Sequence, residues 1–590
     1  MKTITAVFTV LVFLNFLEKI YGFKLTIVHT NDFHSRFEEM DVNGRMCFQR
    51  DREAGLCYGG VARRATEIKR IRSQEKNVVL LDAGDVFTGT LWYVVYRGNA
   101  TWKFMNELGY DAMTLGNHDF DDGPANTARF LSNINCSVVI SNLDASKEPT
   151  WSRDPPLFVK SKVLVIGGEK VGIVGYTLQS ISSVSHPGPN LRFLPEIESV
   201  RSAVSDLKRQ GINKIIALGH AGILVDKKIA EQVDGVDVVV GGHSHTFLYS
   251  GNPIKEHSPK GPYPVVVDSS SNPGQQVPVV QDYAFGLYLG RLEVEFNSEG
   301  KVTNWSGQPI LLDNNVTMDA NMLREINIMK KKVDEISEMK LGRTLVYLNG
   351  NPKECGIKEC NLGNIITDAM VFYYANQTAN SNQWTEVSVA FQMSGSIVVS
   401  IDTSPQEYIT FGHVYNSLPY NNTYDLIELK GTDLKAVLEY SVSTYDPLNP
   451  QAIFLQVSGL HVQYDVSKPS GQRVVSVKVR CSACREPVYH PLRDNTIYKV
   501  VAPSYIVKGG AGYTVLKEKT LSRVVGSHES DILAFYLKAN DPVATGVEGR
   551  ITFVGRESIR SIECVACIES FLVIAMVVIA NTIPLLAQMS

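Results

Sequence analysis

The sequence predicts a two-domain α/β protein in which a helix within residues 318–341 joins the two lobes. At 590 residues the chain is too long for one ordinary hydrophobic core, so at least two domains are expected. Short apolar runs alternate with helical patterns across residues 23–317, as in α/β domains. A second mixture of strand-like and helix-like segments occupies residues 342–553.

The N-terminus predicts a secretory signal. Lys2 precedes an apolar stretch over residues 6–17 and a polar break that ends at Gly22. We therefore expect residues 1–22 to be removed and the protein to be extracellular.

The C-terminus predicts attachment to a membrane. Residues 554–590 contain small polar residues followed by an apolar stretch at 571–587 with no basic residue behind it. This order favours a glycolipid-anchor signal, and a spanning segment remains the alternative.

The cysteines and glycosylation sequons agree with a secreted protein. Three pairs of cysteines lie close together in the sequence and are predicted disulfides: Cys47/Cys57, Cys355/Cys360 and Cys481/Cys484. Cys136 is then expected to be a free, buried thiol at the start of a strand, and Cys564 and Cys567 fall in or beside the C-terminal signal. Acceptor sequons occur at Asn99, Asn135, Asn304, Asn315, Asn376 and Asn421.

The first domain contains five apolar runs with the length of buried strands, at residues 25–28, 78–81, 112–115, 215–218 and 236–240. Helical patterns lie between them at 58–73, 101–108 and 196–210. Glycines follow four of the runs, at Gly84, Gly116, Gly219 and Gly241/Gly242, and we expect sharp turns there.

Each apolar run is followed by side chains that can bind a metal. The seven candidate donors are Asp32, His34, Asp85, Asn117, His220, His243 and His245. Taken singly, Asn117 is typical of a turn and His220 of an ordinary polar residue. Because loops from several strands converge at the carboxyl edge of an α/β sheet, their joint placement instead predicts one site.

The donor set predicts two metal ions. Nitrogen and oxygen donors without thiolate suit a catalytic centre, and seven donors are too many for one tetrahedral ion. We expect two divalent cations that share a carboxylate, with zinc favoured and manganese, magnesium or calcium as alternatives.

The linker and second lobe are predicted from periodicity. Apolar residues recur at helical spacing among charged residues over 319–340. Strands are predicted at 344–347, 387–391 and 498–502, and helices at 362–374 and 432–445. We expect this lobe to hold the substrate over the metals. The net charge of −4 gives no reason to expect a nucleic-acid partner.

Five motifs taken together resemble the 5'-nucleotidase/apyrase family of metallophosphoesterases, and ecto-5'-nucleotidases in particular. They are Thr30-Asn31-Asp32-Phe33-His34-Ser35-Arg36, Leu81-Asp82-Ala83-Gly84-Asp85, Leu115-Gly116-Asn117-His118-Asp119-Phe120-Asp121, Gly219-His220-Ala221-Gly222 and Gly241-Gly242-His243-Ser244-His245. The resemblance implies a four-layer α/β-β-α metallophosphoesterase domain and a C-terminal nucleotide-binding domain. It also suggests that two copies of the chain pair as a homodimer.

The resemblance further assigns roles by motif position. It implies one metal held by Asp32, His34 and His245, and a second held by Asn117, His220 and His243, with Asp85 bridging both. His118 would be the catalytic imidazole, oriented by Asp121. Two such cations would neutralise phosphate oxygens and generate hydroxide for in-line attack on phosphorus.

The second lobe departs from the family pattern. The stretch Met393-Ser394-Gly395-Ser396-Ile397-Val398 lacks the family's asparagine and arginine, Gly356 replaces a substrate arginine, and Ala511 replaces an acidic ribose contact. Losing a charged hydrogen-bond partner costs about 1.5–3 kcal/mol per contact. Tyr420 and Tyr505 fall where the family stacks the base between two phenylalanines.

Three functions are compatible with these observations. The first is an extracellular phosphohydrolase that acts on AMP, or on ADP and ATP as secreted apyrases do. The second is a family member that binds nucleotides or a protein partner with weakened turnover, because the substrate arginines are replaced. The third is hydrolysis of a different phosphoester.

Overall fold

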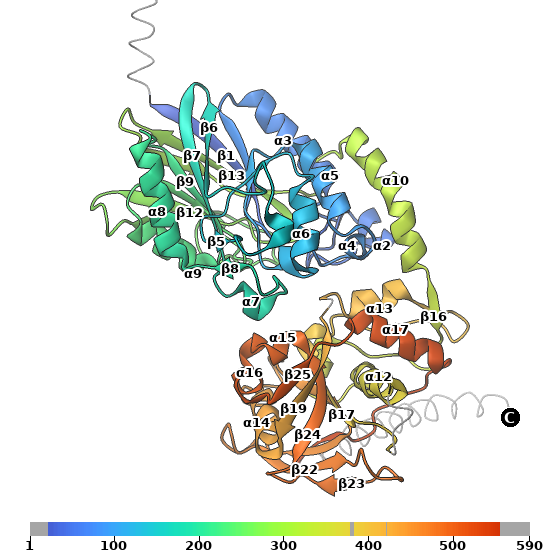
Figure 1. The fold of residues 1–590 in the computed structure, drawn as a ribbon. Helices are drawn as coiled ribbons and strands as arrows, with labels where there is room; N and C mark the ends of the chain where they lie inside the picture. The colour runs from blue at the N-terminus through green and yellow to red at the C-terminus, as the bar shows by residue number, and fades with distance from the viewer. Residues whose placement is uncertain (1–21, 378–382, 421, 555–590) are drawn as a thin grey trace, which may run out of the picture. The chain divides into compact units, whose positions relative to one another are not determined.

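The computed structural model describes residues 22–377, 383–420 and 422–554. The chain forms two compact units (Figure 1). The first comprises Met1–Met339 with Thr410–Asn421, and the second comprises Lys340–Ile409 with Asn422–Ser590. Segment Thr410–Asn421 therefore packs with the first unit, although it lies within the sequence range expected for the second lobe.

Two sheets form the centre of the first unit. One has the order β14-β13-β1-β2-β3-β4, with β15 also paired to β13: β1 Phe23–Thr30, β2 Val78–Asp82, β3 Ala112–Met113, β4 Ser137–Val138, β13 Tyr288–Phe296, β14 Val302–Gly307 and β15 Ile310–Leu311. The other has the order β11-β12-β10-β9-β7-β6: β6 Ser161–Ile166, β7 Glu169–Thr177, β9 Ile215–His220, β10 Val238–Val240, β11 Val265–Asp268 and β12 Gln276–Val280. The strands β1 to β4 are mutually parallel, as are β7, β9, β10 and β12.

Helices cover the outer faces of both sheets. On one side lie α3 Val61–Gln74, α5 Gly98–Leu108 and α6 Gly123–Leu131, and on the other lie α8 Glu196–Arg209 and α9 Ile223–Gln232 (Figure 1). Ile27 and Leu81 of the first sheet belong to the same buried cluster as Ile216 and Val238 of the second. The inner faces of the sheets therefore pack on each other, which confirms the predicted four-layer α/β-β-α arrangement.

A helix is present where the apolar spacing predicts one between the lobes. Helix α10, Ala320–Ser337, begins at the N-cap Asp319, whose carboxylate accepts a hydrogen bond from Met322 N at 3.0 Å. Met322, Ile326 and Val333 are its buried residues. The helix contacts α3 and also α4, Leu91–Tyr96, so it packs along the first unit.

The second unit contains a five-stranded sheet of order β20-β17-β24-β19-β25: β17 Val389–Met393, β19 Tyr424–Lys430, β20 Leu455–Ser458, β24 Ile497–Pro503 and β25 Ser522–Val524. A four-stranded sheet has the order β23-β22-β21-β26: β21 Leu460–Tyr464, β22 Val474–Arg480, β23 Tyr489–Pro491 and β26 Ile551–Phe553. Its main helices are α12 Asn361–Gln377, α14 Gly431–Ser441 and α17 Glu529–Ala539.

One predicted strand of this lobe is wrong. Residues 344–347 contain an isolated bridge from Thr344 to Val543 and no strand. Leu345 and Tyr347 are more than half exposed, so these apolar side chains do not mark a buried strand. The predicted helices at 362–374 and 432–445 correspond to α12 and to α14, which ends earlier, at Ser441.

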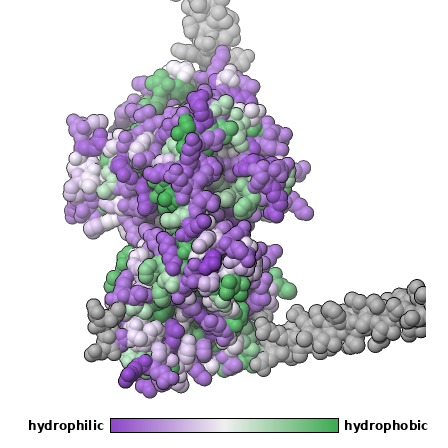
Figure 2. Space-filling view, turned by 90° about the vertical axis from the view of Figure 1, so that its right-hand side faces the viewer, coloured by the Kyte–Doolittle hydropathy of each residue, from purple (hydrophilic) through white to green (hydrophobic). Residues whose placement is uncertain are grey.

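The three predicted disulfides are present, with Cα–Cα distances of 5.8 Å for Cys47–Cys57, 5.3 Å for Cys355–Cys360 and 5.5 Å for Cys481–Cys484. Cys136 is a free thiol next to β4, as expected, but it is half-buried and not fully buried. Most of the surface of the described residues in Figure 2 is hydrophilic, with apolar side chains scattered over it.

Within the described ranges, no helix is long and apolar enough to cross a membrane. Residues 1–21 of the expected signal peptide, the apolar stretch 571–587, Cys564, Cys567 and the sequon Asn421 lie outside these ranges.

Candidate metal centre

All seven predicted donors gather at one edge of the first unit. Asp32 and His34 follow β1, Asp85 follows β2, Asn117 follows β3, and His243 and His245 follow β10. His220 differs from the expectation, because it is the last residue of β9 itself and does not lie on a loop. Its backbone is thereby held by the pairing of β9 with β7, where Thr177 is its partner.

The first group of donors is Asp32, His34 and His245, whose ligand atoms lie within 4.8 Å of one another. The Nε2 atoms of His34 and His245 are 3.2 Å apart, and Nε2 of His245 is 3.4 Å from Oδ1 of Asp32. Two imidazole nitrogens and a carboxylate oxygen therefore converge on a single point.

The second group is Asp85, His220 and His243, again with ligand atoms within 4.8 Å of one another. Asn117 joins this group, because its Oδ1 lies 2.7 Å from Nδ1 of His243. Oδ2 of Asp85 is 3.1 Å from Nε2 of His220 and 3.9 Å from Nε2 of His34. Asp85 thus lies between the two groups.

The backbone of the donors is unusual. Asp32, His34, Asp85, His243 and His245 all have φ between 47° and 76°, in the left-handed region. Aspartate and histidine are among the residue types that tolerate this conformation best, although it is disfavoured for any residue with a Cβ. Such strain collects at functional sites, where the surrounding structure holds it in place.

The glycines beside the donors act mainly by allowing close approach. Only Gly84 has a positive φ, of 89°, and Gly219 lies inside strand β9, so a turn that needs the left-handed conformation of glycine occurs at Gly84 alone among them. A Cβ on Gly116 would lie 2.1 Å from Oδ1 of Asp85, and a Cβ on Gly242 would lie 2.9 Å from Nδ1 of His220. Any side chain at these two positions would displace a donor.

Two of the four donor histidines, His34 and His220, have contacts that favour the tautomer suited to a metal ligand. Nδ1 of His220 lies 2.7 Å from Ala83 O, and Nδ1 of His34 lies 3.3 Å from Phe87 O. A proton on each Nδ1 can be donated to these carbonyls, which leaves both Nε2 lone pairs facing the centre. Nε2 of His220 is buried between two carboxylates, 3.1 Å from Oδ2 of Asp85 and 3.8 Å from Oδ1 of Asp32, as expected of donors that share a cation.

The electrostatics of the centre also fit cations. Burial lowers the pKa of His34 to about 3, so its imidazole is neutral and can bind a metal. Burial opposes the charged forms of Asp32 and Asp85, but the neighbouring histidines hold the pKa of both carboxyls below its usual value. Two ionised carboxylates therefore share a buried site, and divalent cations would neutralise them.

His118 and Asp121 form a pair beside the donors. Nδ1 of His118 lies 2.7 Å from Oδ2 of Asp121, and the His118 ring is 5.2 Å from that of His34 between centroids. Burial lowers the pKa of His118, but the charges of Asp121 and Asp85 outweigh it and raise the pKa to about 10. His118 is thus a proton-bearing group near the donors.

Residues without a predicted role complete the site. Thr88 and Ser185 donate to Asp121 at 3.0 and 2.8 Å and so fix its carboxylate. The buried carboxylate of Asp119 accepts backbone N–H groups from Asp85, Val86, Phe87 and Gly116 at 2.8–3.1 Å. Asp119 stands inside one of the five motifs, whereas no local pattern marks Thr88 or Ser185.

The centre is open on one side. The side chains of His118 and His245 are 34% and 35% exposed, whereas those of Asp32, Asp85 and His220 are at most 2% exposed. A substrate would reach the donors past these two imidazoles.

The two predicted stacking tyrosines lie in different units. Tyr420 is 53% exposed and belongs to the segment that packs with the first unit. Tyr505 is 42% exposed and lies on α15, Ser504–Val507, in the second unit, where its hydroxyl accepts a hydrogen bond from Ala511 N at 3.1 Å. Met393 is buried in the core of the second unit.

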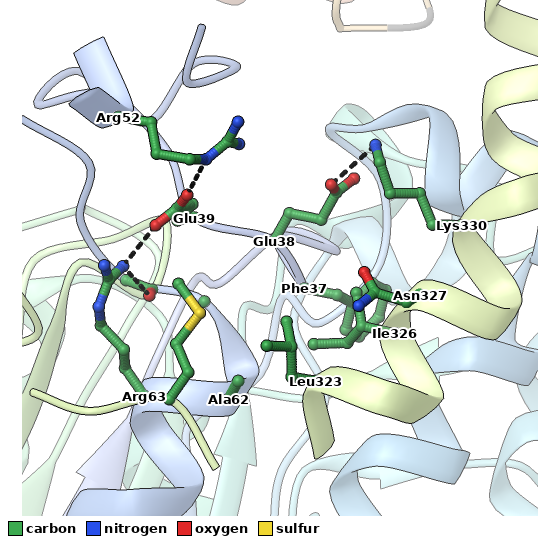
Figure 3. A pocket seen from close by; sticks show the side chains of 13 residues that line it. Phe37, Glu38, Glu39, Arg52, Ala62, Arg63, Leu323, Ile326, Asn327 and Lys330 are labelled. Atoms are coloured by element: carbon green, nitrogen blue, oxygen red, sulfur yellow. Dashed lines mark hydrogen bonds and ion pairs between the residues drawn. The ribbon is translucent and has the colours of Figure 1, made fainter. Parts of the chain in front are cut away.

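A cavity of about 360 Å³ elsewhere in the first unit is not this centre (Figure 3). It lies between α3 and α10, over an apolar floor that includes Phe37 and Ile326. Its carboxylates pair with cations of its own wall, Glu38 with Lys330 at 2.8 Å and Glu39 with Arg63 at 2.9 Å. No predicted metal or catalytic residue is among the described residues that line it.

Comparison with known proteins agrees with this architecture. Residues 25–247 match the family model of calcineurin-like phosphoesterases, and residues 340–518 match that of the 5'-nucleotidase C-terminal domain. A 5'-nucleotidase of Rattus norvegicus is 44% identical over 535 residues, covering 90% of this chain and 91% of the relative. A 5'-nucleotidase of Homo sapiens is 43% identical over 533 residues, with the same coverage of each chain.

A solved structure shows the same fold. The crystal structure of a 5'-nucleotidase precursor from Thermus thermophilus is 39% identical with a TM-score of 0.69. The match covers 90% of this chain and 100% of the other.

Proposed function

Because the chain belongs to the 5'-nucleotidase family of metallophosphoesterases, we propose that it hydrolyses the 5'-phosphate ester of nucleotides, with AMP as a substrate. The observation that carries the proposal is the pair of donor groups that meet at Asp85, with His118 beside their open side. We also propose, more specifically, that the protein removes the outer phosphates of ADP and ATP, as apyrases do.

The donor set fits two divalent cations. Asp32, His34 and His245 would hold one, Asn117, His220 and His243 the other, and Asp85 would contact both. When bound, the cations would neutralise phosphate oxygens and lower the pKa of water for attack on phosphorus. We favour zinc because every donor is nitrogen or oxygen and four of the seven are imidazoles.

In this proposal His118 acts on the substrate. Its charged imidazole, held by Asp121, would donate a hydrogen bond to phosphate oxygens as negative charge develops in the transition state. Asp121 is a positioning residue, because it touches His118 and the hydroxyls of Thr88 and Ser185.

Phosphate release from AMP, ADP and ATP, with and without chelator, tests the function. We expect release from AMP that stops on chelation and returns with zinc. His118→Ala should lower kcat about 10²- to 10³-fold with metal content unchanged. His461→Ala, on β21 in the second unit, is the matched control and should retain full activity. Equal turnover of His118→Ala under saturating metal would refute its role.

A nucleotide-binding protein with weak turnover is the second candidate. The observation that favours it is the second unit, where Met393 is buried in the core and Ala511 offers no carboxylate to a ribose. Equilibrium binding of AMP without phosphate release, in protein that contains two metal ions, would support this candidate over the first.

We further propose that the protein is located at the cell surface. The three disulfides fit an extracellular protein. In this proposal the catalytic domain is formed by residues 23–317. The nucleotide is recognised by residues 342–553, through Tyr420 and Tyr505 among others. A glycolipid signal within residues 554–590 anchors the chain. Release of activity from intact cells by a phosphatidylinositol-specific phospholipase tests the anchor, and light scattering of the released protein tests pairing into a homodimer.

A further inference from the structure

A Cys-x-x-Cys disulfide lies at the tip of a hairpin in the second unit, outside the site described above. Cys481–Cys484 directly follows β22, which pairs with β23 across the hairpin. Cys481 N donates to Val488 O at 2.9 Å, so the backbone of the tip is closed by its own hydrogen bond. The indole of Trp384 also donates to Cys481 O at 2.9 Å.

This disulfide differs from the other two in its access to solvent. Cys355 and Cys360 are 0% and 2% exposed, and Cys47 and Cys57 are 6% and 2% exposed. Cys481 and Cys484 are both only partly buried. Exposed disulfides are the ones that thiols reach and reduce, whereas buried disulfides resist. A reductant should therefore open Cys481–Cys484 first.

A third metal-type ligand stands beside the two sulfurs. The ligand atoms of Cys481, Cys484 and the exposed His490 all lie within 4.8 Å of one another. His490 is held there by β23, whose pairing places it opposite Val479 of β22. Two thiolates and an imidazole form a set that binds soft and borderline divalent cations such as Zn²⁺ and Cd²⁺.

We propose that the reduced hairpin tip is a binding site for one thiophilic divalent cation, held by Sγ of Cys481, Sγ of Cys484 and a ring nitrogen of His490. A dithiol reductant supplies two electrons and two protons, so its own thiols become a disulfide while the Cys481–Cys484 bond becomes two thiols. Binding of the cation releases those two protons to solvent. The oxidised tip has no thiolate and does not bind.

The first arm of the test maps reduction. The full-length protein is treated with a limiting small dithiol, alkylated and analysed by peptide mass spectrometry. We expect alkylation of Cys481 and Cys484 before any of Cys47, Cys57, Cys355 and Cys360. Reduction of Cys355–Cys360 at the same rate would overturn the selectivity on which the proposal depends.

The second arm measures metal binding by the reduced protein. Titration with Cd²⁺ should produce a sulfur-to-cadmium charge-transfer absorption that is absent before reduction. The proposed centre of the first unit has no sulfur donor, so it cannot produce this signal. A Cys481→Ser/Cys484→Ser variant, whose circular dichroism is checked against the parent, supplies the background and should show no such band from the tip.

The third arm tests the imidazole. His490→Ala should weaken Cd²⁺ binding about tenfold or more. The matched control is His461→Ala, which removes a histidine that stacks on Tyr489 at 4.0 Å but is not one of the three ligands. No band in the reduced protein, or equal affinity of the His490→Ala variant and the parent, would overturn the proposal.

Discussion

Asp121 decides the charge of His118. Burial lowers the pKa of this imidazole, and the Asp121 carboxylate is the main group that raises it. In Asp121→Asn the pKa of His118 should fall, so its proton is lost at lower pH. Activity that depends on protonated His118 should then decline on the alkaline side earlier than in the parent. The pH profile of kcat measures this shift.

The neighbouring carboxylate is the control for this prediction. Asp122 accepts from Tyr93 and Arg97 at 2.8 and 3.0 Å, and it is not among the groups that raise the pKa of His118. Asp122→Asn should therefore leave the alkaline decline of kcat at the same pH as in the parent. Identical profiles for Asp121→Asn and the parent would show that another group sets the protonation of His118.

Ala511 is a second residue with a measurable consequence. It has φ 51° and ψ 23°, a left-handed conformation that aspartate tolerates better than alanine, and Tyr505 contacts its N–H. Ala511→Asp adds an acceptor at the position where the sequence resemblance implies a ribose contact, and KM for AMP should fall about tenfold, equivalent to a charged hydrogen bond of about 1.5 kcal/mol. Ala511→Gly relieves the backbone strain at this position without adding an acceptor, so the KM of this variant should stay unchanged. Equal effects of the two substitutions on KM would contradict the ribose contact.

At the scale of elements, Asp119 joins the loop after β2 to the loop after β3. Its carboxylate accepts four backbone N–H groups, three from the first loop and one from the second. In Asp119→Asn an amide NH₂ would face some of these donors, and the free energy of unfolding should fall by about 1–3 kcal/mol. Chemical denaturation with metal removed measures it.

A matched variant lies at the other end of the same strands. Asp111 accepts one backbone N–H, that of Leu80, at 2.8 Å. Asp111→Asn should cost less than Asp119→Asn. A larger loss for Asp111→Asn would mean that the Asp119 contacts are not what holds the two loops together.

The positions of the strand ends could be predicted from sequence, because they depend on residues that are neighbours in the chain. Apolar runs such as 78–81 and 215–218 fix the strands, and parallel pairing then brings Asp85 and His220 to one edge. Thr88 and Ser185 could not be predicted, since Ser185 is 64 residues from Asp121 and only the folded chain places its hydroxyl there. Likewise, the exposed apolar residues at 345–347 imitate a strand without forming one.

At the scale of the whole molecule, metal removal should affect one unit and spare the other. All seven donors lie in the first unit, and without cations Asp32 and Asp85 repel each other in a buried site. A cation at about 1,000 times its Kd contributes about 4 kcal/mol to folding. Scanning calorimetry with chelator should lower the melting temperature of the first unit while that of the second stays constant.

A variant gives this measurement its control. His245→Ala removes one donor from the more exposed side of the centre, so chelation should lower its first-unit melting temperature by less than in the parent. If chelator shifted both units equally, or shifted neither, stabilisation by cations in the first unit would be disproved.

The left-handed backbone at five of the donors restricts how this centre can be altered. Few residue types can replace the ligands at these positions, because aspartate, asparagine and histidine accept the required φ at least cost. This limits any attempt to change the metal by exchanging ligands. Glutamate or cysteine at these positions would add a backbone conformational cost of about 1–2 kcal/mol each. Redesign of metal preference should therefore begin at Asn117 and His220, whose φ values are ordinary, and leave the other five side chains as they are.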